Sequence, residues 1–290
     1  MKHIMTVDLE YDWESDNADN IKIILPKLLD FFDDNHITAT FFVLGEIAEK
    51  FPAEIKSIPK KHEIASHSFS HNFMSKLLAE DVENQIVRAK LSLEKLGLKA
   101  DGFRCPYFVF PKDKEHFYSL LKKHGFTYDS SLSTFFPGRY SNLMAKTVPY
   151  KVSNAQDNGI QDSSGIIELP MPNFVPKLLP AGLSYYRLAY PFSKIFASRL
   201  PYMVYLHPCE FLNKPIGKEI SFFVRQLFKH NQGSKAWRIF TEFIRDSDTE
   251  WVSCREYIGK YLGNLKESAK NNSAEDSNTN HEKENDSSAN

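Results

Sequence analysis

Two histidines four residues apart, His67 and His71, lie in the stretch E-I-A-S-H-S-F-S-H-N-F, directly after a short apolar run. At this spacing both imidazoles lie on one side of a helix or of an extended segment, so one metal ion could bind both of them. The spacing alone does not establish a ligand pair, because two surface or core histidines produce it as well. Other residues must decide between these alternatives.

Two acids, Asp8 and Glu10, end the first apolar run and alternate with Val7 and Leu9 in T-V-D-L-E. In a strand this alternation places both carboxylates on one side, and at the carboxyl end of a parallel strand that side can face an active site. Together with two neutral imidazoles they could form an open site for a divalent ion, with one carboxylate as ligand and one left for proton transfer. Taken alone, the two acids could equally be exposed residues at a strand end.

Four motifs occur together in order: T-V-D-L-E, S-H-S-F-S-H, F-R-C-P-Y and Y-L-H-P-C-E-F. In these motifs the chain resembles the polysaccharide deacetylase family, which is carbohydrate esterase family four with the NodB homology domain, from about His3 to Leu262. It is most similar to the exopolysaccharide-associated branch, whose first motif reads D-x-E and whose last reads L-H-P-W-E. Tyr185 and Arg187 also resemble a Y-x-R-L element of that branch, for which the sequence suggests no chemical role.

The resemblance implies hydrolysis of the N-acetyl amide of an amino sugar, in a polysaccharide, an oligosaccharide or a lipid- or nucleotide-linked precursor, by a water that a metal ion activates. It makes Asp8 the catalytic base and His207 the general acid. It assigns the metal to Glu10, His67 and His71, with Glu10 as the carboxylate ligand because Leu9 stands where the commonest family pattern has aspartate. This ligand set suits Zn²⁺ and also fits iron, cobalt or nickel.

The motif R-C-P-Y contributes two further residues through the resemblance. Arg104 would hold the base, and Tyr107 would supply a backbone N–H for the oxyanion. The family usually pairs the acid histidine with an aspartate followed by tryptophan, and this chain contains no D-W. Asp129 and Glu168, both at expected strand ends, are the candidates to orient His207, and Asp129 is also a candidate contact to the substrate or the metal shell.

Two other functions are compatible with parts of this pattern. Hydrolysis of another small amide, such as a formamide or a cyclic ureide, would use the same groups. A metal-free carbohydrate-binding relative is the alternative outside enzymes, but binding alone gives no chemical reason to have both Asp8 and His207.

Alternating β-rich runs and amphipathic helices must position these residues. The pattern predicts strands at 3–7, 37–45, 62–66, 102–106, 126–130, 166–170, 202–206 and 251–252, and helices at 25–35, 47–61, 79–96, 114–124, 220–230, 235–245 and 255–262. This alternation indicates an α/β fold with a parallel sheet, and the resemblance makes it a distorted (β/α) barrel with outer helices. We expect residues 131–164 to be a loop that could wall the substrate. The aromatic segment 174–202 is either a sugar-stacking or lipid-facing lid or a pair of core helices.

Composition limits the remaining possibilities. We expect one catalytic domain over residues 1–265 and a polar, disordered tail over 266–290, because the tail has too few apolar residues to fold. The net charge of -1 gives no basic field for nucleic acid or an anionic membrane. Three cysteines without a C-x-x-C favour a reducing compartment. With no recognisable signal peptide or membrane-spanning run, we expect a cytoplasmic protein whose partner is an acetylated amino-sugar substrate.

Overall fold

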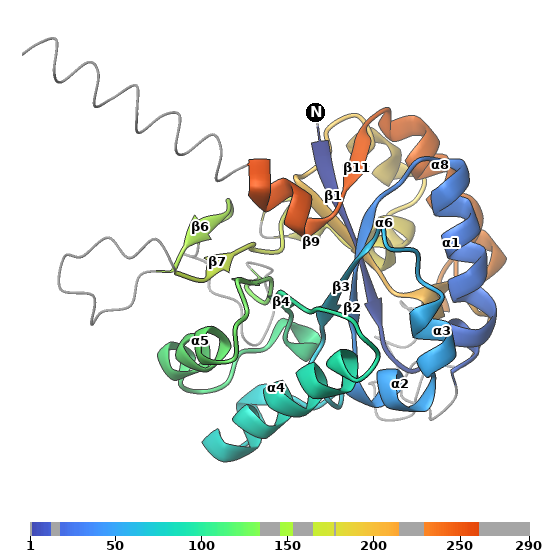
Figure 1. Ribbon diagram of the computed structural model, residues 1–290. Helices are drawn as coiled ribbons and strands as arrows, with labels where there is room; N and C mark the ends of the chain where they lie inside the picture. Colours follow the sequence, from blue (N-terminus) through green and yellow to red (C-terminus); the bar gives the residue numbers. More distant parts are fainter. Residues whose placement is uncertain are drawn as a thin grey trace, which may run out of the picture.

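The computed structural model describes residues 2–12, 18–133, 146–152, 165–176, 178–214 and 229–260. A curled sheet occupies its centre, with helices around it (Figure 1). Within the described residues the strand order is β10-β1-β2-β3-β4-β5-β7-β6, and β11 pairs with the start of β1. The strands are β1 Lys2–Leu9, β2 Ala39–Val43, β3 Glu63–Ser66, β4 Gly102–Phe103, β5 Tyr128–Asp129, β6 Tyr150–Lys151, β7 Ile167–Glu168, β10 Met203–Leu206 and β11 Glu250–Val252.

The pairing confirms the expected parallel α/β architecture, in an open form. Every described pair in this sheet is parallel except β6 with β7. The strands at the two ends of the order, β10 and β6, are not paired to each other in the described part of the chain, so the barrel is incomplete. Because all strands from β1 to β5 run in one direction, the residues that follow β1, β3, β4 and β10 meet at one edge of the sheet.

The helices lie outside the sheet and follow the predicted order with local differences. They are η1 Asn20–Ile24, α1 Leu25–Asp34, α2 Gly45–Lys50, α3 Pro52–Lys56, η2 Met74–Lys76, α4 Ala79–Glu94, η3 Pro106–Phe108, α5 Lys114–Lys123, α6 Leu183–Leu188, η4 Phe192–Phe196, η5 Pro208–Phe211 and α8 Ser234–Ser247. The single helix expected over 47–61 is two helices, because Pro52 cannot donate a backbone hydrogen bond and begins a new one. A one-turn π-helix, η1, precedes α1.

The apolar patterns explain the core. All five residues of β2 are buried, as are Ile4, Val7 and Leu9 of β1, so these central strands are covered on both faces. Phe32 of α1 packs on Phe41 of β2 with ring centroids 6.2 Å apart. Burial of these side chains holds β1 and β2 inside the hydrophobic core.

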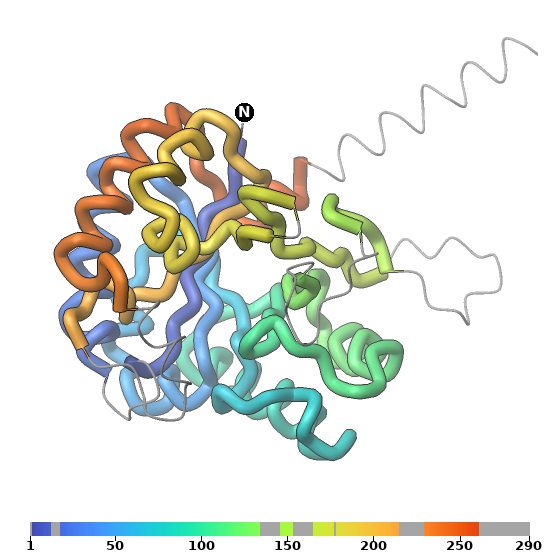
Figure 2. Tube along the Cα trace, turned by 180° about the vertical axis from the view of Figure 1, so that it is seen from behind, coloured from blue at the N-terminus to red at the C-terminus, as the bar shows by residue number. Residues whose placement is uncertain are grey.

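The aromatic segment 174–202 contains two short helices, and the predicted alternative of core helices holds for α6, four of whose six residues are buried. The segment forms the hairpin of β8 (Asn173–Val175) and β9 (Leu179–Pro180), then α6 and η4. Figure 2 shows this segment beside α8, where the Tyr186 and Phe243 rings lie 4.7 Å apart. Phe192 and Ile195 are 83% and 67% exposed, so part of η4 faces solvent.

Some predictions lie outside the described residues: most of the helix at 220–230, the tail from 266, and most of the loop at 131–164. Residues 254–260 are helical, as expected. Among the helices in the described part of the chain, none combines the length and the apolar character needed to cross a bilayer.

Candidate active site

The two acids of the first motif lie at the carboxyl end of β1. Leu9 between them is buried in the hydrophobic core, and the Asp8 side chain is only 2% exposed. Glu10 follows the last strand residue, with 12% of its side chain exposed. The alternation therefore separates one apolar side chain from two carboxylates, as the sequence predicts for a strand in this position.

Glu10, His67 and His71 converge on one point. Each offers one ligand atom, and these three atoms lie within 4.8 Å of one another. Glu10 Oε2 and His71 Nε2 are 2.6 Å apart. Because β1 and β3 are neighbours of β2 and run parallel, the segments that follow them reach the same edge of the sheet.

The environment of His67 suits a metal ligand. Its Nδ1 lies 2.9 Å from the Arg104 carbonyl oxygen. Since a carbonyl only accepts, Nδ1 carries the proton and Nε2 keeps its lone pair for a metal. Burial lowers the pKa of His67 to about 4, so the ring is neutral near pH 7. Burial opposes ionisation of Glu10, but His71, His207 and His67 outweigh it and lower its pKa to about 2. The residues present therefore fit a divalent ion, with two imidazoles and one carboxylate as donors.

Arg104 and Asp8 form a buried ion pair beside these three residues. Arg104 Nη1 donates to Asp8 Oδ1 over 2.6 Å, and the Arg104 side chain is completely buried. The guanidinium also donates to Thr6 and Ser130 and lies 3.9 Å from the centre of the Phe42 ring. Arg104 thus fixes one oxygen of Asp8, while the other, Oδ2, lies 3.9 Å from His207 Nε2.

His207 closes the site from the end of β10. Its Nε2 is 3.7 Å from Glu10 Oε1. Burial opposes its protonation, but Glu10, Glu210 and Asp8 outweigh burial and raise the pKa of His207 to about 9. The ring is therefore protonated near neutral pH, as a proton donor must be.

The expectation that Asp129 or Glu168 orients His207 is wrong. The carboxylate beside this ring is Glu210, whose Oε1 lies 3.4 Å from His207 Nδ1 and accepts from the His207 backbone N–H over 3.2 Å. Glu210 stands three residues after the histidine, the spacing at which a side chain reaches back to the start of a helical turn. The three-residue spacing of His207 and Glu210 in H-P-C-E is the feature of the sequence that could have identified this partner.

Asp129 and Glu168 instead face each other on β5 and β7. Both are completely buried, and they are register partners across the two strands. Asp129 accepts from Ser131 Oγ over 2.6 Å, and Glu168 accepts from Tyr118 and from the Leu132 backbone. Burial raises the pKa of Asp129 to about 6, and burial with Asp129 beside it raises that of Glu168 well above its usual range. This pair is enclosed, so Asp129 is not exposed to a substrate.

Tyr107 lies at the mouth of the site in a left-handed conformation, with φ 58°. Its ring stacks on Phe73, with centroids 4.1 Å apart and an angle of 10°, and lies 4.2 Å from the His71 ring. Tyr107 is 41% exposed. A pair of parallel aromatic rings therefore borders the candidate metal ligands.

The chain after Glu10 is fixed by contacts that the sequence did not reveal. Asn20 Nδ2 donates to the Glu10 carbonyl over 2.6 Å. Asp12 accepts from the Asp19 and Asn20 backbone N–H groups, each over 3.0 Å. Lys214, beyond β10, donates to Asp12 over 2.9 Å. These bonds link the segments that follow β1 and β10.

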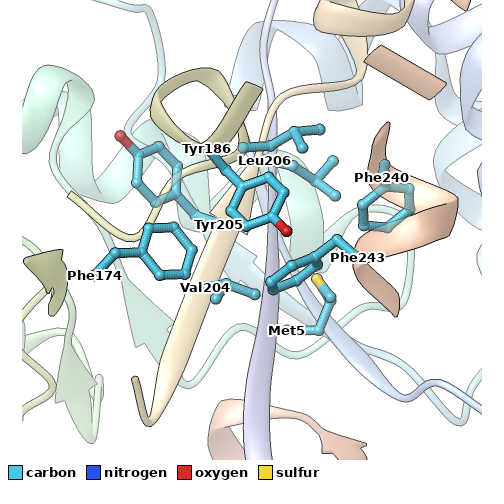
Figure 3. Close-up of a pocket in the computed structure, with 9 residues that line it drawn as sticks. Met5, Phe174, Tyr186, Val204, Tyr205, Leu206, Phe240 and Phe243 are labelled. Atoms are coloured by element: carbon cyan, nitrogen blue, oxygen red, sulfur yellow. The ribbon is translucent and has the colours of Figure 1, made fainter. Parts of the chain in front are cut away.

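An apolar cavity lies on the α6 and α8 side of β10 (Figure 3). None of its lining residues is an acid, a histidine or a lysine; they are Met5, Phe174, Leu183, Tyr186, Val204, Tyr205, Leu206, Phe240 and Phe243. This cavity is a packing feature between helices and sheet, and the candidate chemistry lies elsewhere.

Comparison with known proteins supports the motifs. Residues 6–129 match the family model for polysaccharide deacetylase. The chain is 40% identical over 84 residues to a peptidoglycan-N-acetylglucosamine deacetylase of Bacillus cereus and 30% identical over 94 residues to a chitooligosaccharide deacetylase of Sinorhizobium fredii. These matches cover 28% and 31% of this chain, and 30% and 44% of the two relatives. The chain thus spans less than half the length of the curated relatives it matches.

Two solved structures share the fold over most of the chain. A presumed polysaccharide deacetylase from Mycobacterium smegmatis superposes with a TM-score of 0.58 at 20% identity, covering 91% of each chain. Puue allantoinase superposes with a TM-score of 0.56 at 15% identity, covering 89% of each chain. These likenesses concern the fold alone, since both structures are less than 25% identical to this chain. Residues 6–129 therefore match the polysaccharide deacetylase family, in a stretch that is less than half of the chain.

Proposed function

We propose that this protein is a metal-dependent hydrolase that removes the N-acetyl group from an amino sugar of a glycan. The observation that carries the proposal is the convergence of a metal-ligand set, a base candidate and an acid candidate. Glu10, His67 and His71 offer three ligand atoms within 4.8 Å, and His207 Nε2 lies 3.7 Å from Glu10 and 3.9 Å from Asp8.

Glu10, His67 and His71 would hold the metal. A divalent ion bound there would supply Lewis acidity, polarising the amide carbonyl and making a water more acidic. The donor set suits Zn²⁺ and leaves iron, cobalt and nickel as alternatives. The Arg104 carbonyl keeps the His67 ring in the tautomer that a ligand needs.

Asp8 would accept the proton of the attacking water. Arg104 engages its Oδ1, so Oδ2 is the oxygen that faces His207 and the site. The water oxygen bonds to the carbonyl carbon while its proton passes to Asp8. The Tyr107 backbone N–H is the proposed donor to the oxygen that gains negative charge.

His207 would protonate the leaving nitrogen through Nε2. The C–N bond then breaks with its electron pair on nitrogen, giving acetate and a free amine on the sugar. Amines are poor leaving groups unless protonated, so this transfer is as necessary as the attack of water.

The stacked rings of Phe73 and Tyr107 support a sugar as the substrate. They lie beside His71 at the mouth of the site, and the apolar face of a pyranose packs on flat aromatic rings.

The names of the relatives suggest peptidoglycan fragments and chitooligosaccharides as the first candidates. The D-x-E motif supports the exopolysaccharide-associated branch. The three cysteines are free and buried, which agrees with the proposed cytoplasmic location.

The test is a hydrolysis assay of the zinc-loaded and cobalt-loaded protein on acetylated chitooligosaccharides, peptidoglycan fragments, formamides and cyclic ureides. Acetate and formate release are measured, with ring opening for the ureides. Asp8→Asn should keep its metal and lose about 10²–10⁴-fold in rate, the usual contribution of a general base. Glu10→Ala should lose the metal, and Asp33→Asn, which changes an exposed acid of α1 outside the site, serves as the control.

Acetate release from a sugar, lost in Asp8→Asn, would support the proposal. Release of formate or ureide products alone would transfer the mechanism to another small amide. Binding of glycans with no turnover by any metal form would indicate a carbohydrate-binding relative and refute the enzymatic role.

A further inference from the structure

Arg187 of α6 is completely buried and linked to two segments outside its own helix. Its Nε donates to Glu210 Oε2 over 2.8 Å, and its Nη1 donates to the His230 carbonyl. The Asn231 side chain donates back to the Arg187 carbonyl over 2.9 Å. Arg187 is therefore fixed at both its side chain and its backbone.

Glu210 connects this arginine to the site. One carboxylate oxygen, Oε2, accepts from Arg187, while the other, Oε1, faces the His207 backbone N–H and Nδ1 at 3.2 and 3.4 Å. The Glu210 carbonyl accepts from the Gly233 backbone over 2.9 Å. The side chains of Arg187 and Glu210 are both 0% exposed. Two fully buried opposite charges constrain each other, because either one alone would be buried without compensation.

The geometry at His207 follows from this arrangement. A carboxylate only accepts, so the contact with Glu210 requires a proton on His207 Nδ1. With that edge of the ring held, Nε2 is directed at Asp8 and Glu10. We propose that Arg187 is a positioning residue that acts through Glu210 to fix the ring orientation and neutral tautomer of His207. The inference rests on the proposed function, in which His207 donates a proton through Nε2.

A purely structural role is the alternative, since Arg187 also joins α6 to the segment before α8. The two roles differ in whether the effect of Arg187 depends on His207. A positioning residue loses its influence on the rate once the positioned side chain is gone, whereas a structural residue does not.

The test is a double-mutant cycle with Arg187→Met and His207→Ala on the metal-loaded full chain. Arg187→Met should lower kcat by about 10–100-fold with KM changed less than about 3-fold, the usual loss for a residue that orients an active-site group. In the His207→Ala background the same change should lower kcat by less than about 2-fold. Arg187→Lys, which keeps a cation, should recover part of kcat. The control is Tyr190→Phe, at a residue just beyond α6. It removes a partly buried hydrogen bond to Glu242 and should leave kcat unchanged.

A second measurement does not need turnover. Long-range ¹H–¹⁵N spectra of the imidazoles are recorded at a pH high enough for His207 to be neutral, with His207 assigned from His207→Ala, and should show a proton on Nδ1 of the wild type. Arg187→Met should shift this ring toward the Nε2–H tautomer, and Tyr190→Phe should not. If the wild type hydrolyses no substrate, the proposed function fails while the spectra still decide the role of Arg187.

Equal losses of kcat in both backgrounds, or an unchanged His207 spectrum in Arg187→Met, would overturn the inference. Folding is checked by circular dichroism and thermal melting. Should Arg187→Met fail to fold, Arg187→Lys enters the same cycle and the same spectra, where a loss confined to the background that contains His207 is the expected result.

Discussion

Replacing Arg104 by methionine is expected to destabilise the fold strongly, because it leaves Asp8 buried without its cation. The two side chains are 0% and 2% exposed and lie 2.6 Å apart. Removing one partner of a buried pair costs about 3–5 kcal/mol, since the remaining charge cannot return to water. For a domain of this size, about 2–4 °C of melting temperature correspond to each kcal/mol, so the expected decrease is roughly 6–20 °C.

A matched control separates burial from contact geometry. Lys2 and Glu250 also lie 2.6 Å apart and also involve β1, but their side chains are 39% and 59% exposed. Lys2→Met is therefore expected to leave the melting temperature nearly unchanged, because water and salt screen an exposed pair.

The double variant tests the reason for the loss. Adding Asp8→Asn to Arg104→Met removes the uncompensated charge and should recover about 1–3 kcal/mol, a typical coupling between neighbours. Thermal and urea unfolding of the metal-free protein measure all four corners of the cycle. A double variant that is less stable than Arg104→Met alone would refute the argument, as would a loss below about 1 kcal/mol for Arg104→Met.

Two further predictions concern substrate affinity and pH. Phe73→Ala removes one ring of the stacked pair and should raise KM about 5–10-fold with kcat nearly unchanged, since a stacking contact contributes about 1 kcal/mol to binding; a fall in kcat alone would contradict this. Burial lowers the pKa of His62 in the folded protein to about 4, below the value of about 6.5 in the unfolded chain. The unfolded chain therefore takes up the proton first, and the metal-free protein should become less stable as pH falls from about 6.5 to 4. The loss should reach about 3 kcal/mol, and His62→Asn, measured by urea unfolding across this range, should flatten the slope; an unchanged slope would contradict the assignment.

Most of the sheet could be predicted because its strands carry a local signal. The run around Ala39–Val43 is apolar on both faces, and Gly45 ends it, so both the strand and its burial follow from side-chain types. The start of α1 at Leu25 follows from the position of Pro26. The π-helix before it could not be predicted, since it depends on Asp12 accepting the backbone N–H groups of Asp19 and Asn20 from outside the helix.

The candidate metal ligands carry a local signal of another kind. His67 and His71 are close in sequence, and Glu10 follows a buried strand that runs parallel to theirs, so their meeting at one edge requires only the parallel order of β1, β2 and β3. The Arg104–Asp8 pair adds one long-range contact, which the motif supplied.

The partner of His207 required information that strand order does not contain. Asp129 and Glu168 stand at the ends of neighbouring strands, so strand order alone made them reasonable candidates, but β5 and β7 lie at the opposite side of the sheet from β10. Glu210 was nearer in sequence yet harder to choose, because a buried carboxylate three residues from a histidine is tolerable only when a cation accompanies it. That cation, Arg187, stands 23 residues earlier in the sequence, on α6. Which carboxylate lies beside His207 is thus decided by charge compensation in the core. That compensation is a property of the folded chain, and it can be recognised only when α6 is placed against β10.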